Sequence, residues 1–181
     1  QLSVVQYSTP NTKMALANAK GKVGVAARNG IANGGIKVTP TLLRKTEPMT
    51  GQRIMSEQVA HDSVMMMRRV VTNGTASMAK MDEYAIAGKT GTADKPKRGG
   101  GYYDDKVVNT FASVFPANDP KYVLVVTLDE PVETSGPKPR RTAGWTAVPV
   151  AAEIIRRTAP LLGMRPQVEA ASLDGLTAVK Q

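Results

Sequence analysis

The spacing of apolar residues predicts a helix over residues 56–71. Ser56 suits the N-cap, and Glu57 suits the positive end of the helix dipole. Asn73-Gly74 follows as a stop signal. One face of this helix is predicted to carry a mostly apolar stripe of Val59, Ser63, Met66, Val70 and Val71.

Three segments that follow this helix have the pattern of β-strands. They are residues 84–92, residues 107–115 and the nearly unbroken apolar run 122–128. The turn residues at 118–120 predict that the last two strands form a hairpin, and a long polar loop over 94–106 is expected between the first two. A loop of this length between neighbouring strands is more often functional than inert.

A last helix is predicted over residues 144–162, ending near Pro160. Its apolar residues recur every three or four positions, so Trp145 at its start is expected to be a buried packing anchor. The stripe consists of Trp145, Val148, Ala152, Ile155, Ala159 and Leu162. Strands followed by a helix favour an α+β fold, an antiparallel sheet with flanking helices.

The N-terminal region has a weaker pattern. Residues 11–28 are rich in Ala and Lys and are compatible with a helix, although Gly21 and Gly24 weaken it. Residues 36–39 alternate apolar and polar side chains before Pro40, which indicates a short extended stretch.

Composition excludes several classes of chemistry. Of the 181 residues, 41% are hydrophobic and 22% are charged, which is ordinary for a folded domain. The chain has no cysteine and a single histidine, His61, so thiol catalysis and the usual metal sites are excluded, and neither a metal nor a cofactor is expected. We interpret His61 as a surface residue without a catalytic role, and Met65-Met66-Met67 as flexible core filling rather than a cofactor site.

The net charge of +9 is typical of a protein that binds an anionic partner, such as nucleic acid, an anionic membrane surface or an anionic substrate. The basic residues are densest at 95–98 and 138–141, next to Pro or Gly, and we interpret both segments as solvated loops. Aromatic residues make up only 4% of the chain, which argues against a stacking platform for nucleic acid. No nucleic-acid partner is therefore expected.

The candidate chemistry lies in Lys89-Thr90-Gly91-Thr92, near the end of the first predicted strand. A lysine here places a cation at the edge of a strand, and threonine hydroxyls can hold a carboxylate. Gly91 has no side chain, so a substrate can approach the backbone closely. A peptide can also pair with an exposed strand edge.

Lys-Thr-Gly is one of three signatures of penicillin-recognising serine enzymes, and its flanks extend the likeness. In order and spacing, residues 31–166 closely resemble the C-terminal part of the class B penicillin-binding proteins, of the FtsI type. The segments that carry this resemblance are Asn33-Gly34-Gly35, Val38-Thr39-Pro40, 71–76, 87–95, 111–116, 119–122, 129–131, 143–149, 154–157 and 163–166.

This resemblance implies a serine-type D,D-transpeptidase that crosslinks peptidoglycan stem peptides ending in D-Ala-D-Ala and binds β-lactam antibiotics. By motif, Lys89 would support the electrostatics at the nucleophile and at the substrate carboxylate. The hydroxyls of Thr90 and Thr92 would contact that carboxylate, and the Thr92 N–H would be one oxyanion-hole donor. Gly91 completes the substrate-binding strand.

The sequence departs from the family at the nucleophile. It has no Ser-x-Asn, and no Ser-x-x-Lys lies far upstream of Lys89, where the family has its active serine. Ser77-Met78-Ala79-Lys80 and Ser135-Gly136-Pro137-Lys138 match that pattern only formally. We expect both serines in loops, because a helix stop precedes Ser77 and prolines flank Lys138. Neither is expected to be acylated.

The chain is therefore expected to be the C-terminal piece of a transpeptidase domain over residues 1–166, followed by a tail over 167–181. The resemblance begins near residue 31, and residues 1–30 match the family poorly. By the same resemblance, the full protein would act in septal wall synthesis at the periplasmic face of the inner membrane. It would be anchored by a segment outside this chain and contact divisome membrane proteins.

Three alternative functions remain compatible with the sequence. A β-lactamase or D,D-carboxypeptidase would use the same strand, although the 94–106 loop and the Pro-rich 131–142 segment fit the class B type better. A penicillin-sensing receptor domain would be acylated without crosslinking anything. A basic nucleic-acid-binding protein would need an affinity that falls steeply with salt.

Overall fold

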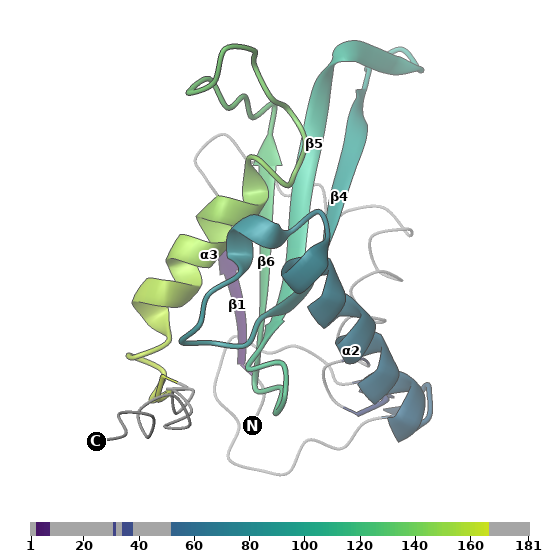
Figure 1. The fold of residues 1–181 in the computed structure, drawn as a ribbon. Coiled ribbons are helices and arrows are strands. Elements are labelled where there is room, and N and C mark those ends of the chain that lie inside the picture. The colour runs from purple at the N-terminus through teal and green to yellow at the C-terminus, as the bar shows by residue number, and fades with distance from the viewer. Residues whose placement is uncertain (1–2, 8–30, 32–33, 38–51, 167–181) are drawn as a thin grey trace, which may run out of the picture.

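The computed structural model describes residues 3–7, 31, 34–37 and 52–166, and within them a four-stranded sheet forms the centre of the fold (Figure 1). The strand order is β1-β6-β5-β4. The bounds of these strands are β1 Ser3–Tyr7, β4 Ala87–Pro96, β5 Tyr102–Phe115 and β6 Tyr122–Asp129. The expected α+β class is confirmed, with β4, β5 and β6 antiparallel.

The expected hairpin between the last two strands is confirmed, and its register runs from Val108 opposite Asp129 to Phe115 opposite Tyr122. The expected loop over 94–106 is wrong, because β4 and β5 continue as a paired hairpin through most of it and leave residues 97–101 as the turn. This hairpin extends beyond the rest of the sheet (Figure 1). Polar residues on both faces of a projecting hairpin leave no apolar alternation to detect.

One strand was not anticipated from the sequence. β1 pairs with β6 in parallel, with Ser3 opposite Tyr122 and Tyr7 opposite Val126. β1 therefore extends the antiparallel sheet as a parallel edge strand, an arrangement that is common in mixed sheets.

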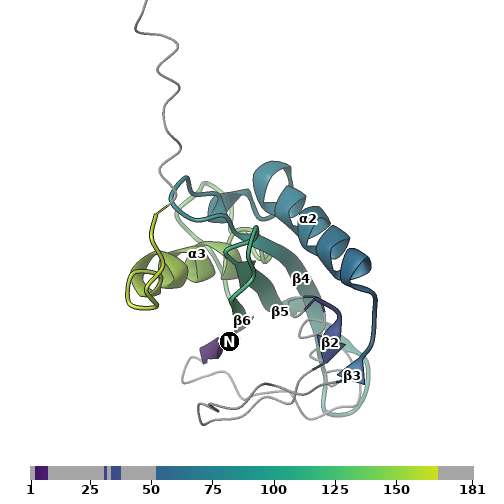
Figure 2. The same ribbon diagram turned by 90° about the horizontal axis from the view of Figure 1, so that it is seen from below.

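The last helix, α3 (Ala147–Thr158), is shorter than predicted and covers one face of the sheet (Figure 2). Its buried residues are mostly small, so the helix can lie close to the sheet. They are Ala147, Val148, Ala151, Ala152 and Ile155. The partners of this face in the sheet include the fully buried Phe111, Phe115, Leu124 and Val126. A short 3-10 helix, η1 (Ser77–Ala79), contributes Ala79 to the same core.

The other long helix, α2 (Glu57–Asn73), packs along β4 at the edge of the sheet (Figures 1 and 2). Its predicted start is confirmed, because the backbone N–H of Val59 donates a hydrogen bond of 3.2 Å to the Ser56 hydroxyl. The Arg68 guanidinium donates to the carbonyl oxygen of Ile86 at 2.9 Å, which ties the helix to the segment leading into β4.

The predicted stripe on α2 is wrong in part. The buried residues are Ala60, Val64 and Val71, whereas Val59 and Met66 are exposed. Met65 is exposed as well, so of the methionine run expected to fill the core only Met67 packs against it. Val64 packs with Ala87, Val114, Ala117 and Val123 on the sheet face opposite α3.

Residues 36–39 were expected to be extended, and the two residues that the structure describes there form β2 (Ile36–Lys37). β2 pairs with β3 (Gln52–Arg53). Gly35 precedes β2 with φ +93°, and a Cβ there would lie 2.1 Å from the carbonyl oxygen of Met55. The expected helix over 11–28 and the tail over 167–181 lie outside the described residues. Among the helices that are described, none is long and apolar enough to cross a membrane.

Candidate functional site

The Lys-Thr-Gly segment lies in β4, the outermost strand of the described sheet. One edge of β4 is hydrogen bonded to β5, and no further strand pairs with its other edge within the described residues. Lys89 pairs with Ala112 and Thr90 with Phe111. Alternation along the strand therefore places Lys89 and Gly91 on one face and Thr90 and Thr92 on the other. The lysine and the threonines therefore lie on opposite faces of a strand whose second edge is paired with no other described strand.

A close contact sets the position of this strand. Gly88 lies against Phe111, and a Cβ at Gly88 would be 2.5 Å from the nearest carbon of the Phe111 ring. The same Cβ would be 2.9 Å from the carbonyl oxygen of Ala112. Both distances are far inside van der Waals contact, so only glycine fits where β4 passes the ring. The residue before Lys89 is therefore held by the buried core.

Both threonine hydroxyls on the α3 face of β4 have hydrogen-bond partners from other segments. Thr90 Oγ1 lies 2.8 Å from Thr75 Oγ1, which follows α2 in the turn before η1. Thr92 Oγ1 accepts a hydrogen bond of 3.0 Å from the backbone N–H of Ala143, which precedes α3. The turns beside α2 and α3 thus hold the two hydroxyls in place, which the sequence motif alone did not reveal.

Lys89 and Gly91 are exposed. The Lys89 ammonium donates a hydrogen bond of 2.7 Å to the carbonyl oxygen of Thr90, so the cation lies beside the strand backbone. A Cβ at Gly91 would meet only the carbonyl oxygen of Thr110, at an ordinary 3.8 Å. Packing against the described residues therefore does not demand glycine at position 91.

Asn109 is a structural support of the site that the sequence analysis missed. It is fully buried and lies opposite Thr92 in the strand register. Its amide donates to the carbonyl oxygen of Arg141 at 2.6 Å and to the Thr146 hydroxyl at 2.7 Å. These bonds join β5 to the segment that carries Ala143. The available signal in the sequence was an asparagine within a predicted apolar strand. If such a side chain is buried, it needs hydrogen-bond partners from elsewhere in the fold.

The expectation that Trp145 is a buried anchor is wrong. Its exposure is 43%, because α3 begins only at Ala147 and the apolar stripe was extended beyond the helix. The Arg140 guanidinium stacks over the indole at 3.8 Å from the ring centre. A Cβ at Gly136 would lie 2.6 Å from an Arg140 nitrogen, so the 131–142 segment folds closely over this cation.

The two formal Ser-x-x-Lys matches are exposed, and the expected loop position is confirmed for Ser135 but not for Ser77, which lies in a 3-10 helix. Ser77 opens η1, and both Ser77 and Lys80 face solvent. Ser135 and Lys138 are exposed in the segment after β6. Within the described residues, neither pair is enclosed by the protein, as a serine nucleophile activated by a neighbouring lysine would need to be. His61 is exposed on α2, where its nearest polar partner is Asp62 at 3.5 Å.

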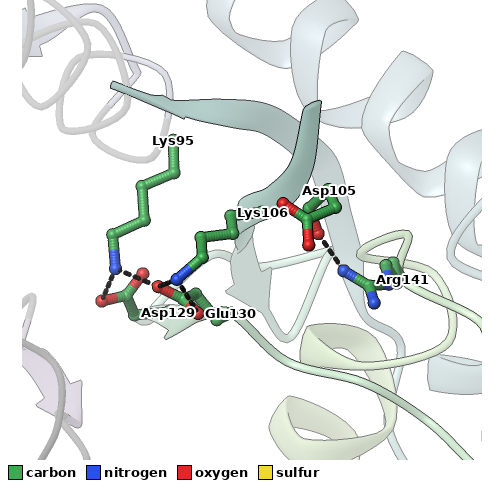
Figure 3. Close-up of polar contacts among 6 residues, drawn as sticks. All are labelled: Lys95, Asp105, Lys106, Asp129, Glu130 and Arg141. Atoms are coloured by element: carbon green, nitrogen blue, oxygen red, sulfur yellow. Dashed lines mark hydrogen bonds and ion pairs between the residues drawn. The ribbon is translucent and has the colours of Figure 1, made fainter. Parts of the chain in front are cut away.

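An ion-pair cluster holds the projecting β4–β5 hairpin against the end of β6 (Figure 3). The Lys95 ammonium lies 2.8 Å from Asp129 Oδ2 and 2.6 Å from Glu130 Oε1, and Lys106 lies 3.2 Å from Glu130 Oε2. Glu130 has φ +52°, a left-handed conformation uncommon for a non-glycine residue. The basic segments are therefore not simply solvated loops. Arg141 in the second one donates to the carbonyl oxygen of Asp105 (Figure 3).

Titration of this cluster leads to a testable pH dependence. Hydrogen bonds from Lys95 and then Lys106 lower the pKa of Glu130 below its ordinary 4.5, so its stabilising effect is complete above pH 4.5 and is lost as the pH falls through the lowered value. Hydrogen bonds to Asp129 and then Glu130 raise the pKa of Lys95 above 10.5, so that effect is complete below pH 10.5 and is lost at higher pH. We expect Glu130→Gln to destabilise the chain more at pH 7 than at pH 3.

Urea unfolding at both pH values measures this difference. Glu83→Gln is the matched control, because Glu83 is exposed and makes no ion pair within the described residues. Its stability difference from the wild type is expected to be small at both values. A Glu130→Gln effect of equal size at pH 3 and pH 7 would contradict the assignment.

Comparison with known proteins places this chain in a family. Residues 25–156 match the family model of the penicillin binding protein transpeptidase domain. The probable peptidoglycan D,D-transpeptidase FtsI of Caulobacter vibrioides is 32% identical over 154 residues, which are 79% of this chain and 26% of that protein. The chain spans about a fifth to a quarter of the length of the curated relatives it matches.

Solved structures agree with this match. The transpeptidase domain of penicillin-binding protein 3 from Burkholderia pseudomallei superimposes with a TM-score of 0.66 at 31% identity, covering 78% of this chain and 42% of that one. Penicillin-binding protein 3 of Mycobacterium tuberculosis in complex with ampicillin superimposes with a TM-score of 0.65 at 28% identity, covering 81% of this chain and 35% of that one.

The edge strand with its Lys-Thr-Gly segment, backed by an antiparallel sheet and helices, is thus part of a transpeptidase domain. The chain belongs to the penicillin binding protein transpeptidase family, and its relatives place it with the FtsI-type class B proteins.

Proposed function

We propose that the protein containing this chain is a serine-type D,D-transpeptidase that crosslinks peptidoglycan stem peptides in septal wall synthesis and binds β-lactams. This chain supplies the substrate-binding strand, and the nucleophilic serine belongs to a part of the domain outside it. Residues 1–166 would form the C-terminal part of that domain and residues 167–181 a tail. The observation that carries the proposal is the Lys-Thr-Gly segment on the open edge of β4.

The geometry of this edge suits an acyl-transfer reaction on a peptide with a terminal carboxylate. A stem peptide ending in D-Ala-D-Ala would lie along β4, where a strand edge offers backbone hydrogen bonds. The hydroxyls of Thr90 and Thr92 would bind the terminal carboxylate on one face. Lys89, on the other face, would supply positive charge to the nucleophile and the carboxylate. The Thr92 N–H would donate to the oxyanion, opposite the N–H of the active serine.

The setting follows from the same proposal. The full protein would be anchored at the inner membrane by a segment outside this chain, with this domain in the periplasm and divisome membrane proteins as partners. A net charge of +9 suits an anionic polymer close to an anionic membrane surface. The ampicillin complex of the similar Mycobacterium tuberculosis protein supports the proposal that this protein binds β-lactams.

The test uses the full-length protein with a fluorescent penicillin and a peptidoglycan substrate that carries pentapeptide stems. We expect covalent labelling and crosslinked dimers. Labelling that is stable without dimers would overturn the proposal in favour of a receptor. Rapid hydrolysis of the penicillin would indicate a β-lactamase, and release of D-Ala without dimers a D,D-carboxypeptidase.

The isolated 181-residue chain is the matched control for this experiment. We expect mass spectrometry to find no adduct after incubation with benzylpenicillin, because Ser77 and Ser135 lie in exposed segments whose lysines stay hydrated. An adduct on either serine would overturn the assignment of the nucleophile to another part of the protein.

A further inference from the structure

Thr75 occupies a closely packed turn beside the candidate substrate strand. The turn follows α2, and the backbone N–H of Ala76 donates to the carbonyl oxygen of Val70 at 3.1 Å. On its other side the turn meets the segment before α3, where a Cβ at Gly144 would lie 2.6 Å from the Thr75 carbonyl oxygen. The backbone of Thr75 is therefore held between two segments, while its side chain is exposed and reaches β4.

The hydroxyls of Thr75, Thr90 and Thr92 carry three protons, and their hydrogen bonds decide how many of these can be donated to a ligand. Thr75 Oγ1 and Thr90 Oγ1 are 2.8 Å apart and share one hydrogen bond, which uses one of their two protons. Thr92 Oγ1 accepts from the Ala143 N–H and keeps its own proton. Two hydroxyl protons thus remain for a ligand, as many as the oxygens of one carboxylate.

The direction of the shared hydrogen bond decides whether Thr90 can bind an anion. If Thr90 donates to Thr75, it presents only lone pairs to a carboxylate, which repel it. If Thr75 donates to Thr90, the Thr90 proton is free to point at the carboxylate. A bound anion therefore selects the second arrangement, in which Thr90 has a donor behind it as Thr92 has in Ala143.

We propose that Thr75 is a positioning residue, whose hydroxyl donates to Thr90 and orients the Thr90 proton toward the substrate carboxylate. The inference rests on the proposed function and adds to it a residue outside the Lys-Thr-Gly strand. Thr75 acts through Thr90, so its effect depends on a carboxylate in the ligand.

The test compares acylation of the full-length protein by a penicillin and by the methyl ester of the same penicillin. We expect Thr75→Val to slow acylation by the free acid by roughly 3- to 10-fold, the range that one hydrogen bond supplies. Acylation by the ester is expected to change little. Thr75→Ser keeps the hydroxyl and should restore the rate with the free acid.

Thr72→Val is the matched control. Thr72 lies near the end of α2, the helix before the Thr75 turn, and its hydroxyl donates a hydrogen bond to Asn73 rather than to β4. It should leave both rates unchanged. If Thr75→Val does not fold, Thr75→Ala removes the same hydroxyl from a smaller side chain. In a Thr90→Val background, removal of the Thr75 hydroxyl should have no further effect.

Two results would overturn the inference while the proposed function stands. One is a Thr75→Val protein acylated as fast as the wild type, and the other is an equal loss with acid and ester, which a merely structural role would produce. A wild-type protein that is not labelled at all would instead overturn the proposed function and this inference with it.

Discussion

Replacement of Lys89 by alanine is expected to nearly abolish acylation of the full-length protein by penicillin and to leave its fold intact. Lys89 is exposed on β4 and its ammonium donates a hydrogen bond to the backbone of its own strand, so we expect its removal to cost charge at the site rather than core packing. Loss of one charged or hydrogen-bonding group that stabilises an acyl-transfer transition state costs on the order of 10²- to 10³-fold in rate. Labelling with a fluorescent penicillin, followed over time, measures this loss.

Lys80→Ala is the control for Lys89→Ala. Lys80 is an exposed lysine nine residues earlier and belongs to one of the formal Ser-x-x-Lys matches. Its removal should leave labelling unchanged. Unchanged labelling of the Lys89→Ala protein would remove the central role of Lys89 from the proposal, and a large loss in Lys80→Ala would reopen Ser77 as a nucleophile.

Phe111→Ala is expected to cause a large loss of stability, about 3–5 kcal/mol of unfolding free energy. Phe111 is fully buried in the core between the sheet and α3, and its ring also fills the space beside Gly88. The cavity would lie directly behind the Lys-Thr-Gly strand. Urea unfolding followed by circular dichroism measures the change.

Trp145→Ala gives an aromatic comparison on the same chain. Trp145 is 43% exposed and stacks on Arg140, so its removal should cost only roughly 1–2 kcal/mol, from partial burial and one cation–π contact. A larger loss for Trp145→Ala than for Phe111→Ala would contradict the observed burial of these two side chains.

Local signals in the sequence were enough for several features of this protein. Ser56 and Asn73-Gly74 mark the ends of α2, because capping depends on neighbouring residues. The turn at 118–120 joins β5 and β6 as predicted, and the Lys-Thr-Gly segment with its flanks identified the family before any geometry was known. Capping and turn formation depend on residues close together in the chain, and the family resemblance depends on short motifs in a fixed order.

Packing between distant segments decided the remaining features. Three consecutive methionines on α2 point to different sides of the helix, so contact with β4, rather than their sequence, determines that Met65 and Met66 are exposed. The projecting hairpin depends on Lys95 meeting Asp129 and Glu130, more than 30 residues away. A run of charged residues in the sequence predicts a loop. Only the folded structure shows that these residues have ion-pair partners and form paired strands.

The site shows the same division. Residue types and order identified Lys89, Thr90, Gly91 and Thr92 as candidates, but alternation in the folded strand places the lysine and the threonines on opposite faces. The contacts that hold the hydroxyls join residues 15 and 51 positions apart, Thr75 with Thr90 and Thr92 with Ala143. A hydrogen bond between such distant residues leaves no periodic trace in the sequence, because it exists only once sheet and helices have packed.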